Sequence, residues 1–169
     1  MAGGLPRTQA QRAAVQALYQ SLVNNQAPEK DTMDFVMAEY ANKIDKNYFQ
    51  LLVEGVTKEI DTIDAELTHA VDRSLATVDP VEISVLRLAV FEYIHRPDIP
   101  YRVVLNEAVE LAKSFGGEQG HKYVNGVLDK MSARLRQAEY QAAKAARAQK
   151  KSELINWPEK IKPSRRGFF

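Results

Sequence analysis

The segment from Pro80 to Ile94, PVEISVLRLAVFEYI, limits the possible folds of this chain more than any other segment. Its apolar residues occupy nearly every side of a helix, and such a helix belongs in the middle of a bundle. Its start is also well marked, with Asp79 at the N-cap, Pro80 at the first helical position and Glu82 two residues later. The sequence therefore predicts an all-α domain built around this helix.

Apolar residues recur at helical spacing through most of the remaining sequence up to about residue 136. Thr8 and Asp45 are predicted N-caps, and Pro100 is predicted to open a helix that ends at Gly116-Gly117. No long strand pattern is present, so we expect six or seven helices. The predicted helices cover about 8–22, 33–40, 45–56, 61–73, 80–94, 100–115 and 118–136.

The composition of the chain excludes several classes of protein. Apolar residues make up 45% and charged residues 27%, as in soluble globular proteins. The chain has no cysteine, which excludes a disulfide scaffold and a cysteine nucleophile and suits a reducing cytoplasm. Apolar runs are too short for a membrane span, and Gln and Arg interrupt the start as they would not in a signal peptide. We expect a cytoplasmic protein that does not enter membranes.

Charge is unevenly distributed along the chain. Residues 137–169 carry a net charge of +5 and have no apolar stripe, whereas residues 1–136 carry −4. We therefore expect a helical domain over 1–136 and a basic, flexible extension over 137–169. Arg7 and Arg12 make the N-terminus basic as well, because no acidic residue precedes Glu29. Basic ends of this kind often contact an anionic partner.

The last predicted helix contains Asn125-Gly126, a pair more typical of a β-hairpin turn. Glycine inside a helix costs about 1 kcal/mol relative to alanine, so a packing or functional reason for it is expected. One explanation is close packing, in which the missing side chain lets a neighbouring helix approach. The other is that HKYVNG, residues 121–126, presents polar and aromatic groups to a ligand.

Three blocks resemble the NusB family of bacterial transcription antitermination factors: RAAVQALYQ, PVEISVLRLAVFEY and PYRVVLNEAVELAKSFGGEQGHKYVNGVLDK. The resemblance runs from about Arg7 to Lys130, in the family's order. It implies an all-α, NusB-like fold of two small helical bundles and a role without enzymatic activity or cofactor. That role is pairing with NusE, a small-subunit ribosomal protein, to bind single-stranded boxA RNA in ribosomal-RNA leader transcripts. There the complex helps RNA polymerase to read through terminators. The oligomeric state is left open, a homodimer included.

The resemblance also implies site residues, and places HKYVNG beside the N-terminal helix on the side that faces RNA. Aromatic rings suit unstacked bases and cationic side chains suit phosphates. Tyr123 could equally be a half-buried core residue, and Glu82 could serve as both a helix cap and a partner contact. The implied RNA-binding residues are Arg7, Arg12, Gln16, Lys122, Tyr123 and Asn125. The implied NusE-binding residues are Glu82, Arg87 and Glu92.

The sequence departs from the family at both ends. The family start usually has several arginines in tandem, but only Arg7 and Arg12 are present here, which predicts weaker and less salt-sensitive RNA binding. The extension over 137–169 is additional to the family pattern. It is either a disordered, solubilising tail or an auxiliary contact to RNA that replaces the missing arginines.

The sequence also contains a pattern found in metal-binding bundles, and NusB-like domains also occur as modules of RNA methyltransferases. Glu66–His69 and Glu118–His121 both follow the Glu-x-x-His pattern, of which di-iron carboxylate bundles use two copies. Neither copy lies in an apolar stripe, so this metal-binding alternative rests on a short motif alone. A NusB-like module of an RNA methyltransferase would require a glycine-rich cofactor domain after Lys130. Only 39 residues follow, with a single glycine.

Overall fold

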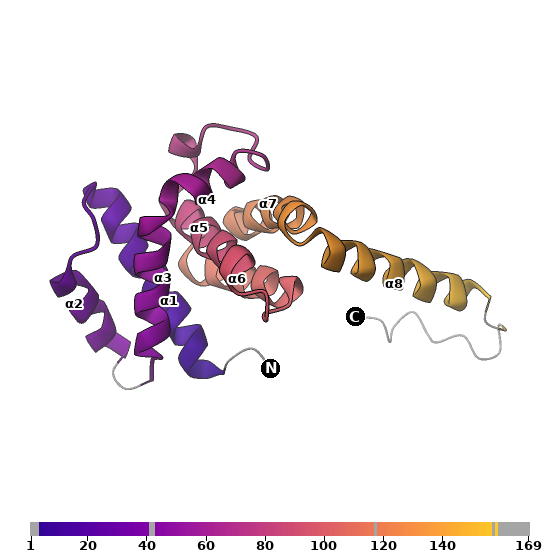
Figure 1. Cartoon of the computed structure of the whole chain (residues 1–169), viewed down its shortest axis with the longest axis horizontal. Helices are drawn as coiled ribbons and strands as arrows, with labels where there is room; N and C mark the ends of the chain where they lie inside the picture. The colour runs from indigo at the N-terminus through magenta and orange to yellow at the C-terminus, as the bar shows by residue number, and fades with distance from the viewer. Residues whose placement is uncertain (1–3, 41–42, 117, 157, 159–169) are drawn as a thin grey trace. The chain divides into compact units, whose positions relative to one another are not determined.

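The computed structural model describes residues 4–40, 43–116, 118–156 and 158, without the side chain of Glu118 (Figure 1). The described residues form α-helices, one short 3₁₀-helix (Leu75–Thr77) and no strand. The all-α prediction is therefore confirmed for this part of the chain. The α-helices are α1 (Leu5–Asn24), α2 (Lys30–Tyr40), α3 (Lys46–Lys58), α4 (Ile60–Leu67), α5 (Pro80–His95), α6 (Tyr101–Phe115), α7 (Glu118–Leu135) and α8 (Gln137–Ile155).

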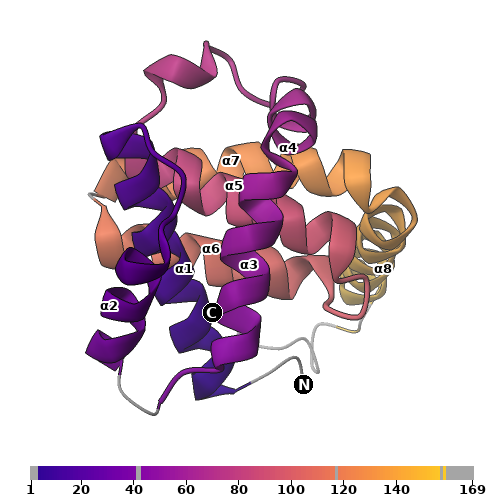
Figure 2. The same ribbon diagram turned by 60° about the vertical axis from the view of Figure 1, so that its left-hand side comes forward.

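Helix α5 is the central helix, as its sequence predicts. It packs against α1, α3, α4, α6 and α7 (Figure 1, Figure 2). Ten of its sixteen residues are buried. Asp79 caps its start, because one carboxylate oxygen accepts hydrogen bonds from the backbone N–H groups of Val81 (2.9 Å) and Glu82 (3.3 Å). The capping residues in the sequence and the packing in the structure thus both define this helix.

Two groups of helices meet at α5. In the first group, α1 packs on α2 and α3, and in the second, α6 and α7 pack on each other and on α5. Contacts of α1 and α3 with α5 join the two groups. This is the arrangement of two small helical bundles that the family resemblance implies.

Two predicted helix boundaries were wrong. Thr8 is not an N-cap: α1 begins at Leu5, and Pro6 fits in the first turn, where its missing N–H needs no partner. Helix α4 ends at Leu67 rather than near residue 73, and the chain continues through turns to the 3₁₀-helix. Asp45 is the N-cap of α3 as predicted, accepting from the Tyr48 N–H at 3.0 Å. Gly117, predicted to help end α6, lies outside the described residues.

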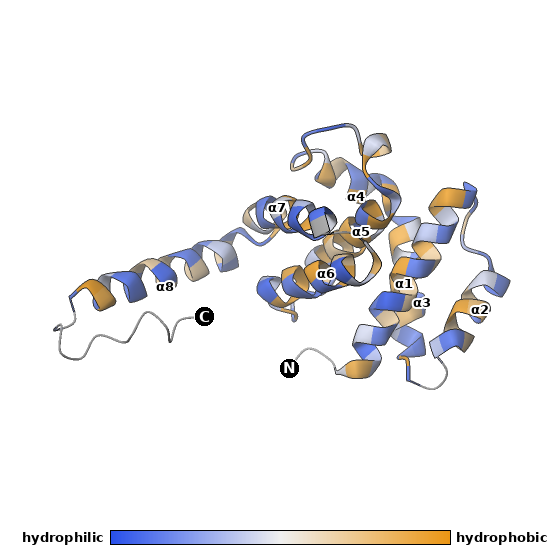
Figure 3. Cartoon of the chain, turned by 180° about the vertical axis from the view of Figure 1, so that it is seen from behind, coloured by the Kyte–Doolittle hydropathy of each residue, from blue (hydrophilic) through white to orange (hydrophobic). Residues whose placement is uncertain are grey.

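The chain divides into two compact units, one up to Arg136 and the other from Gln137 onward. The second unit contains α8, which has no buried residue among those described. Its sequence favours helix through alanine, glutamine and lysine. Figure 3 shows α8 in mostly hydrophilic colours, in contrast to the largely hydrophobic α5. The predicted extension is thus helical up to Ile155.

Among the described residues, no helix has both the length and the apolar character that crossing a bilayer requires.

Candidate functional site

One face of α7 presents the central part of HKYVNG to solvent. Lys122, Asn125 and Gly126 are all exposed, and their spacing of three and four residues places them on one side of the helix. A Cβ atom at Gly126 would meet no atom within 4 Å. The close-packing explanation for Gly126 is therefore wrong, and the glycine instead leaves open space on a polar face of the helix.

Tyr123 lies at the edge of this face, half-buried, beneath a residue that the sequence analysis did not select. The guanidinium carbon of Arg73 lies 4.6 Å from the centroid of the Tyr123 ring, a cation–π arrangement. Burial raises the pKa of the Tyr123 hydroxyl, and the positive charge of Arg73 opposes that rise. Arg73 belongs to the segment between α4 and α5, and a single arginine in a loop carries no sequence pattern that would identify it.

The two predicted residues in the middle of α1 point toward neighbouring helices. Arg12 donates a hydrogen bond to Ser114 Oγ at 3.1 Å, near the end of α6. Gln16 donates to a carboxylate oxygen of Glu39 at 2.9 Å and accepts from the Tyr40 hydroxyl at 3.4 Å, both on α2. Both predicted residues are half-buried. Arg12 also lines a hollow of about 280 Å³ between α1 and α6.

Arg7 is buried, which corrects the expectation that it faces RNA. Only 7% of the residue is exposed. Its Nη1 atom donates to both carboxylate oxygens of Glu107 at 2.9 Å, and its Nη2 atom lies 3.1 Å from Glu92 Oε2. Arg7 therefore ties the start of α1 to α5 and α6, and its charge is neutralised inside the protein.

Glu92 is also buried, with 1% of the residue exposed, so it offers no surface to a protein partner. Besides Arg7, its carboxylate accepts hydrogen bonds from Gln11 Nε2 at 3.0 and 3.2 Å and from the Tyr48 hydroxyl. Burial raises the pKa of the Glu92 carboxyl, while Tyr48 and Arg7 act in the opposite direction. One predicted RNA-binding residue and one predicted partner-binding residue are thus bonded to each other in the core.

The three predicted partner-binding residues do not share a face of α5. At 3.6 residues per turn, Arg87 points about 140° away from Glu82 and also from Glu92, and Glu82 and Glu92 point about 80° apart. Glu82 lies beside α7, where its Oε1 atom would be 2.9 Å from a Cβ atom at Gly120. Burial and the neighbouring charge of Asp79 raise the pKa of its carboxyl.

Arg87 lies on the side of α5 that faces α4. Its Nε and Nη2 atoms each donate to one carboxylate oxygen of Asp64 at 2.9 Å. It also lines a hollow of about 280 Å³ bounded by α1, α3, α4 and α5. Leu18, Leu22, Val56 and Ile60 contribute apolar side chains to the same hollow. Leu22 and the neighbouring Val23 are exposed large hydrophobic residues, so this side of the protein combines apolar surface with a paired charge.

The residues predicted to bind RNA thus fall into two clusters rather than one. Helix α7 packs mainly on α5 and α6, and α1 packs mainly on α2, α3 and α5, so α1 and α7 are not principal neighbours in the described structure. The expectation that HKYVNG lies directly beside the N-terminal helix stays a prediction. The hydrogen bond from Arg12 to Ser114 brings α1 to the end of α6, four residues before α7 begins.

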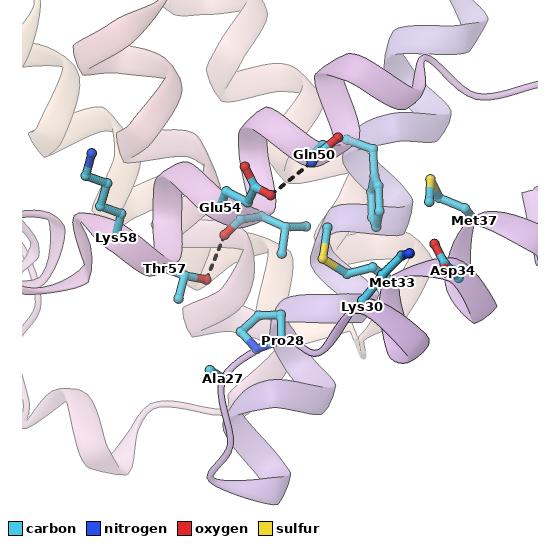
Figure 4. A pocket seen from close by; sticks show the side chains of 12 residues that line it. Ala27, Pro28, Lys30, Met33, Asp34, Met37, Gln50, Glu54, Thr57 and Lys58 are labelled. Carbon is cyan, nitrogen blue, oxygen red and sulfur yellow. Dashed lines mark hydrogen bonds between the residues drawn. The ribbon is translucent and has the colours of Figure 1, made fainter.

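A further hollow lies elsewhere. It measures about 690 Å³ and lies between α2 and α3, lined by Met33, Met37 and Val53 among others (Figure 4). Helix α2 buries only Val36 and packs mainly on α1, which leaves a gap beside α3. None of the nine predicted site residues lines this hollow.

The described residues do not support the metal-binding alternative. No group of three or more of their acidic and histidine side chains is placed to hold a metal ion. Glu66 instead accepts a 2.7 Å hydrogen bond from Arg134 Nε, as part of an ion pair. The side chain of Glu118, from the second Glu-x-x-His copy, lies outside the described residues.

Comparisons with known proteins agree with this fold. Residues 8–133 match the sequence model of the NusB family. The transcription antitermination protein NusB of Hahella chejuensis is 46% identical over 139 residues, which span 82% of this chain and 93% of that protein. The chain belongs to the NusB family. The NusB of Burkholderia ambifaria is 47% identical over 136 residues, covering 80% of this chain and 94% of that protein. A solved structure of T. maritima NusB matches with a TM-score of 0.68 at 30% identity, covering 75% of this chain and 90% of that one.

The NusB family match does not extend over α8, because it ends at residue 133. Within the matched region, burial of Arg7 leaves Arg12 as the one arginine of α1 that reaches the surface of the described structure. This NusB-family chain therefore presents even less positive charge on α1 than its sequence suggests.

Proposed function

We propose that this chain acts in transcription antitermination by binding boxA-type single-stranded RNA together with NusE, and so reaches the RNA polymerase antitermination complex indirectly. The relatives that support this proposal are named transcription antitermination proteins. The observation that carries the RNA-binding part is the exposed face of α7. There Lys122 offers a cation to phosphate, Asn125 offers an amide to base edges, and Gly126 leaves room for a close approach.

The contribution of α1 to this interface is small. Arg12 supplies one cation close to the end of α6, and Gln16 supplies an amide that is already bonded to Glu39. Each phosphate contact to single-stranded nucleic acid contributes about 0.7 to the salt slope of binding. With few cations on α1 and on the exposed face of α7, the protein alone should bind RNA weakly and with a shallow dependence on salt.

NusE would supply the missing affinity. For its binding we favour the side of the protein that holds the hollow beside Arg87, because exposed apolar side chains such as Leu22 surround a positioned charge there. An apolar centre with polar groups at its edge is typical of protein–protein interfaces. Glu82, in the first turn of α5 and beside Gly120 of α7, is the other predicted NusE-binding residue that is not buried. The side that holds the hollow beside Arg87 includes no residue of α7, so NusE bound there would leave the exposed face of α7 free for RNA.

The proposal is tested by titrating the protein into a labelled boxA-like strand and a scrambled strand of the same composition, with and without saturating NusE, at one fixed salt concentration. We expect preference for the boxA-like strand and a higher affinity when NusE is present. Thermodynamic linkage requires RNA to increase the affinity for NusE by the same factor. Equal affinity for both strands, unchanged by NusE, would contradict the proposal.

A further inference from the structure

Arg73 lies over the aromatic ring of Tyr123, for which the family resemblance implies RNA binding. Its guanidinium carbon lies 4.6 Å from the centroid of the Tyr123 ring. The Tyr123 hydroxyl is buried and has no hydrogen-bond partner within the described structure. Nearly half of the Arg73 side chain, 49%, remains exposed. A ligand that approaches this part of α7 therefore meets the guanidinium group first and the ring only behind it.

The chemistry of a stacked guanidinium suits RNA. The group is planar, so one face can lie on Tyr123 while the opposite face remains available to an unstacked base. Its N–H donors point outward in the same plane and can meet a phosphate at the same time. The Nε atom donates to Asp72 Oδ1 at 2.9 Å, which fixes one edge of the group. Tyr123 and Asp72 thus both contact the Arg73 guanidinium group.

We propose that Arg73 is an RNA-binding residue of this protein and that Tyr123 acts as a positioning residue beneath it. A base of the single strand stacks on the outer face of Arg73, and the Nη donors contact a neighbouring phosphate. The segment between α4 and α5 thereby contributes to the site, where it contacts α7 at Tyr123. This inference rests on the proposed RNA-binding function and adds to it a cation outside the N-terminal helix.

The described structure offers a matched control. Arg134 also lies near the α4–α7 region, and its Nε atom pairs with Glu66 Oε2 at 2.7 Å. Its side chain is 44% exposed, close to the value for Arg73. It lies over no aromatic ring among the described residues. Arg134→Ala and Arg73→Ala remove the same charge, so only a specific role of Arg73 would separate the two variants.

The test measures the affinity for boxA-like RNA, with saturating NusE, at four or more salt concentrations. For Arg73→Ala we expect at least about a five-fold loss of affinity, the lower end of the range for one lost base stack. Its salt slope should fall by about 0.7, the value of one phosphate contact. Arg73→Lys should keep the slope but not the full affinity, because an ammonium group cannot stack as a plane. Arg134→Ala should change neither quantity appreciably.

Variants of Tyr123 test the positioning role. Tyr123→Phe should bind like the unchanged protein, because the hydroxyl makes no hydrogen bond in the described structure. Tyr123→Ala should weaken binding. The double variant with Tyr123→Ala and Arg73→Ala should lose less binding free energy than the sum of the two single losses, because the two residues act as a unit. Chemical denaturation of each variant corrects the binding data for any unfolded fraction.

The outcomes separate this inference from the proposed function. RNA binding by the unchanged protein together with normal affinity and slope for Arg73→Ala would overturn the role of Arg73 alone. Equal losses in Arg134→Ala and Arg73→Ala would overturn it too, because the effect would then be one of net charge. Failure of the unchanged protein to bind RNA at any salt concentration would overturn both.

Discussion

Arg7 and Glu92 are 85 positions apart in the sequence and form an ion pair in the interior, with 3.1 Å between Arg7 Nη2 and Glu92 Oε2. Their side chains are 8% and 1% exposed. The pair joins the first turn of α1 to the central helix α5. Because Glu107 on α6 accepts from the same guanidinium group, Arg7 connects three helices. Its position at the basic N-terminus suggests RNA binding, but its contacts are those of a structural residue.

Removing Arg7 should therefore destabilise the fold. Arg7→Ala leaves Glu92 as an uncompensated buried carboxylate, which typically costs about 3–5 kcal/mol of unfolding free energy. Arg12→Ala is the matched control on the same helix, because Arg12 is half-buried and donates a hydrogen bond to Ser114. It should cost less than about 1 kcal/mol. Urea denaturation of the two variants measures both values, and similar small losses would contradict the structural role of Arg7.

The raised pKa of Glu92 predicts a dependence of stability on pH. Because burial raises its pKa in the folded protein above that of the unfolded chain, the folded state retains the proton to higher pH. The contribution of Glu92 to stability is then fully present below the unfolded pKa and declines as the pH rises through the folded pKa. Glu92→Gln cannot titrate and should lack this decline. Parallel slopes of unfolding free energy against pH for the two proteins would refute the prediction.

Two glycines should respond to alanine in opposite ways. At Gly126 a Cβ atom enters open space, so Gly126→Ala should stabilise the protein by about 0.5–1 kcal/mol through the helix propensity of alanine. At Gly55 a Cβ atom would overlap with the ring of Phe91 at Cε2. Gly55→Ala should therefore destabilise by about 1–3 kcal/mol, as overpacking in a core does. Thermal unfolding of both variants checks the two signs.

These glycines illustrate what a sequence can and cannot predict. The caps at Asp45 and Asp79 were predicted correctly because a cap depends on residues two or three positions away. Close packing was one of the two explanations given for Gly126, but whether a helical glycine meets a neighbour depends on which face the tertiary fold turns inward. The central place of α5 was predictable because its apolar residues leave no polar face.

The site residues show the same limit more clearly. Arg7 and Arg12 look equivalent in sequence, and only the approach of α5 and α6 makes one structural and leaves the other at the surface. Lys122 and Asn125 were named as site residues through the family resemblance, and the structure leaves both exposed. The contact of Arg73 with Tyr123 joins the segment between α4 and α5 to α7, and no local sequence pattern predicts such a pairing.

Arg136 should prove to be a strong determinant of stability. Its Nε atom donates to the carbonyl oxygen of Tyr93 at 2.9 Å, Nη1 to that of Ile99 at 3.0 Å and Nη2 to that of Arg96 at 2.8 Å. It thereby closes the C-terminal end of α5. Arg136→Ala would leave buried carbonyl groups unpaired, at a cost of about 2–4 kcal/mol. Arg136→Lys should recover only part of this, because an ammonium group cannot reach all three carbonyls in one plane. Full recovery with lysine would show that charge alone matters.

The central claim is that the exposed face of α7 binds RNA, and Lys122→Ala tests it most directly. Lys58→Ala is the control, since Lys58 is an exposed lysine on α3, beside the hollow shared with α2. The measurement is the affinity for boxA-like RNA with saturating NusE across a series of salt concentrations. Lys122→Ala should weaken binding and reduce the salt slope by about 0.7, while Lys58→Ala should leave both nearly unchanged. An unaltered affinity and slope in Lys122→Ala, or equal changes in the two variants, would contradict the assignment of RNA binding to α7.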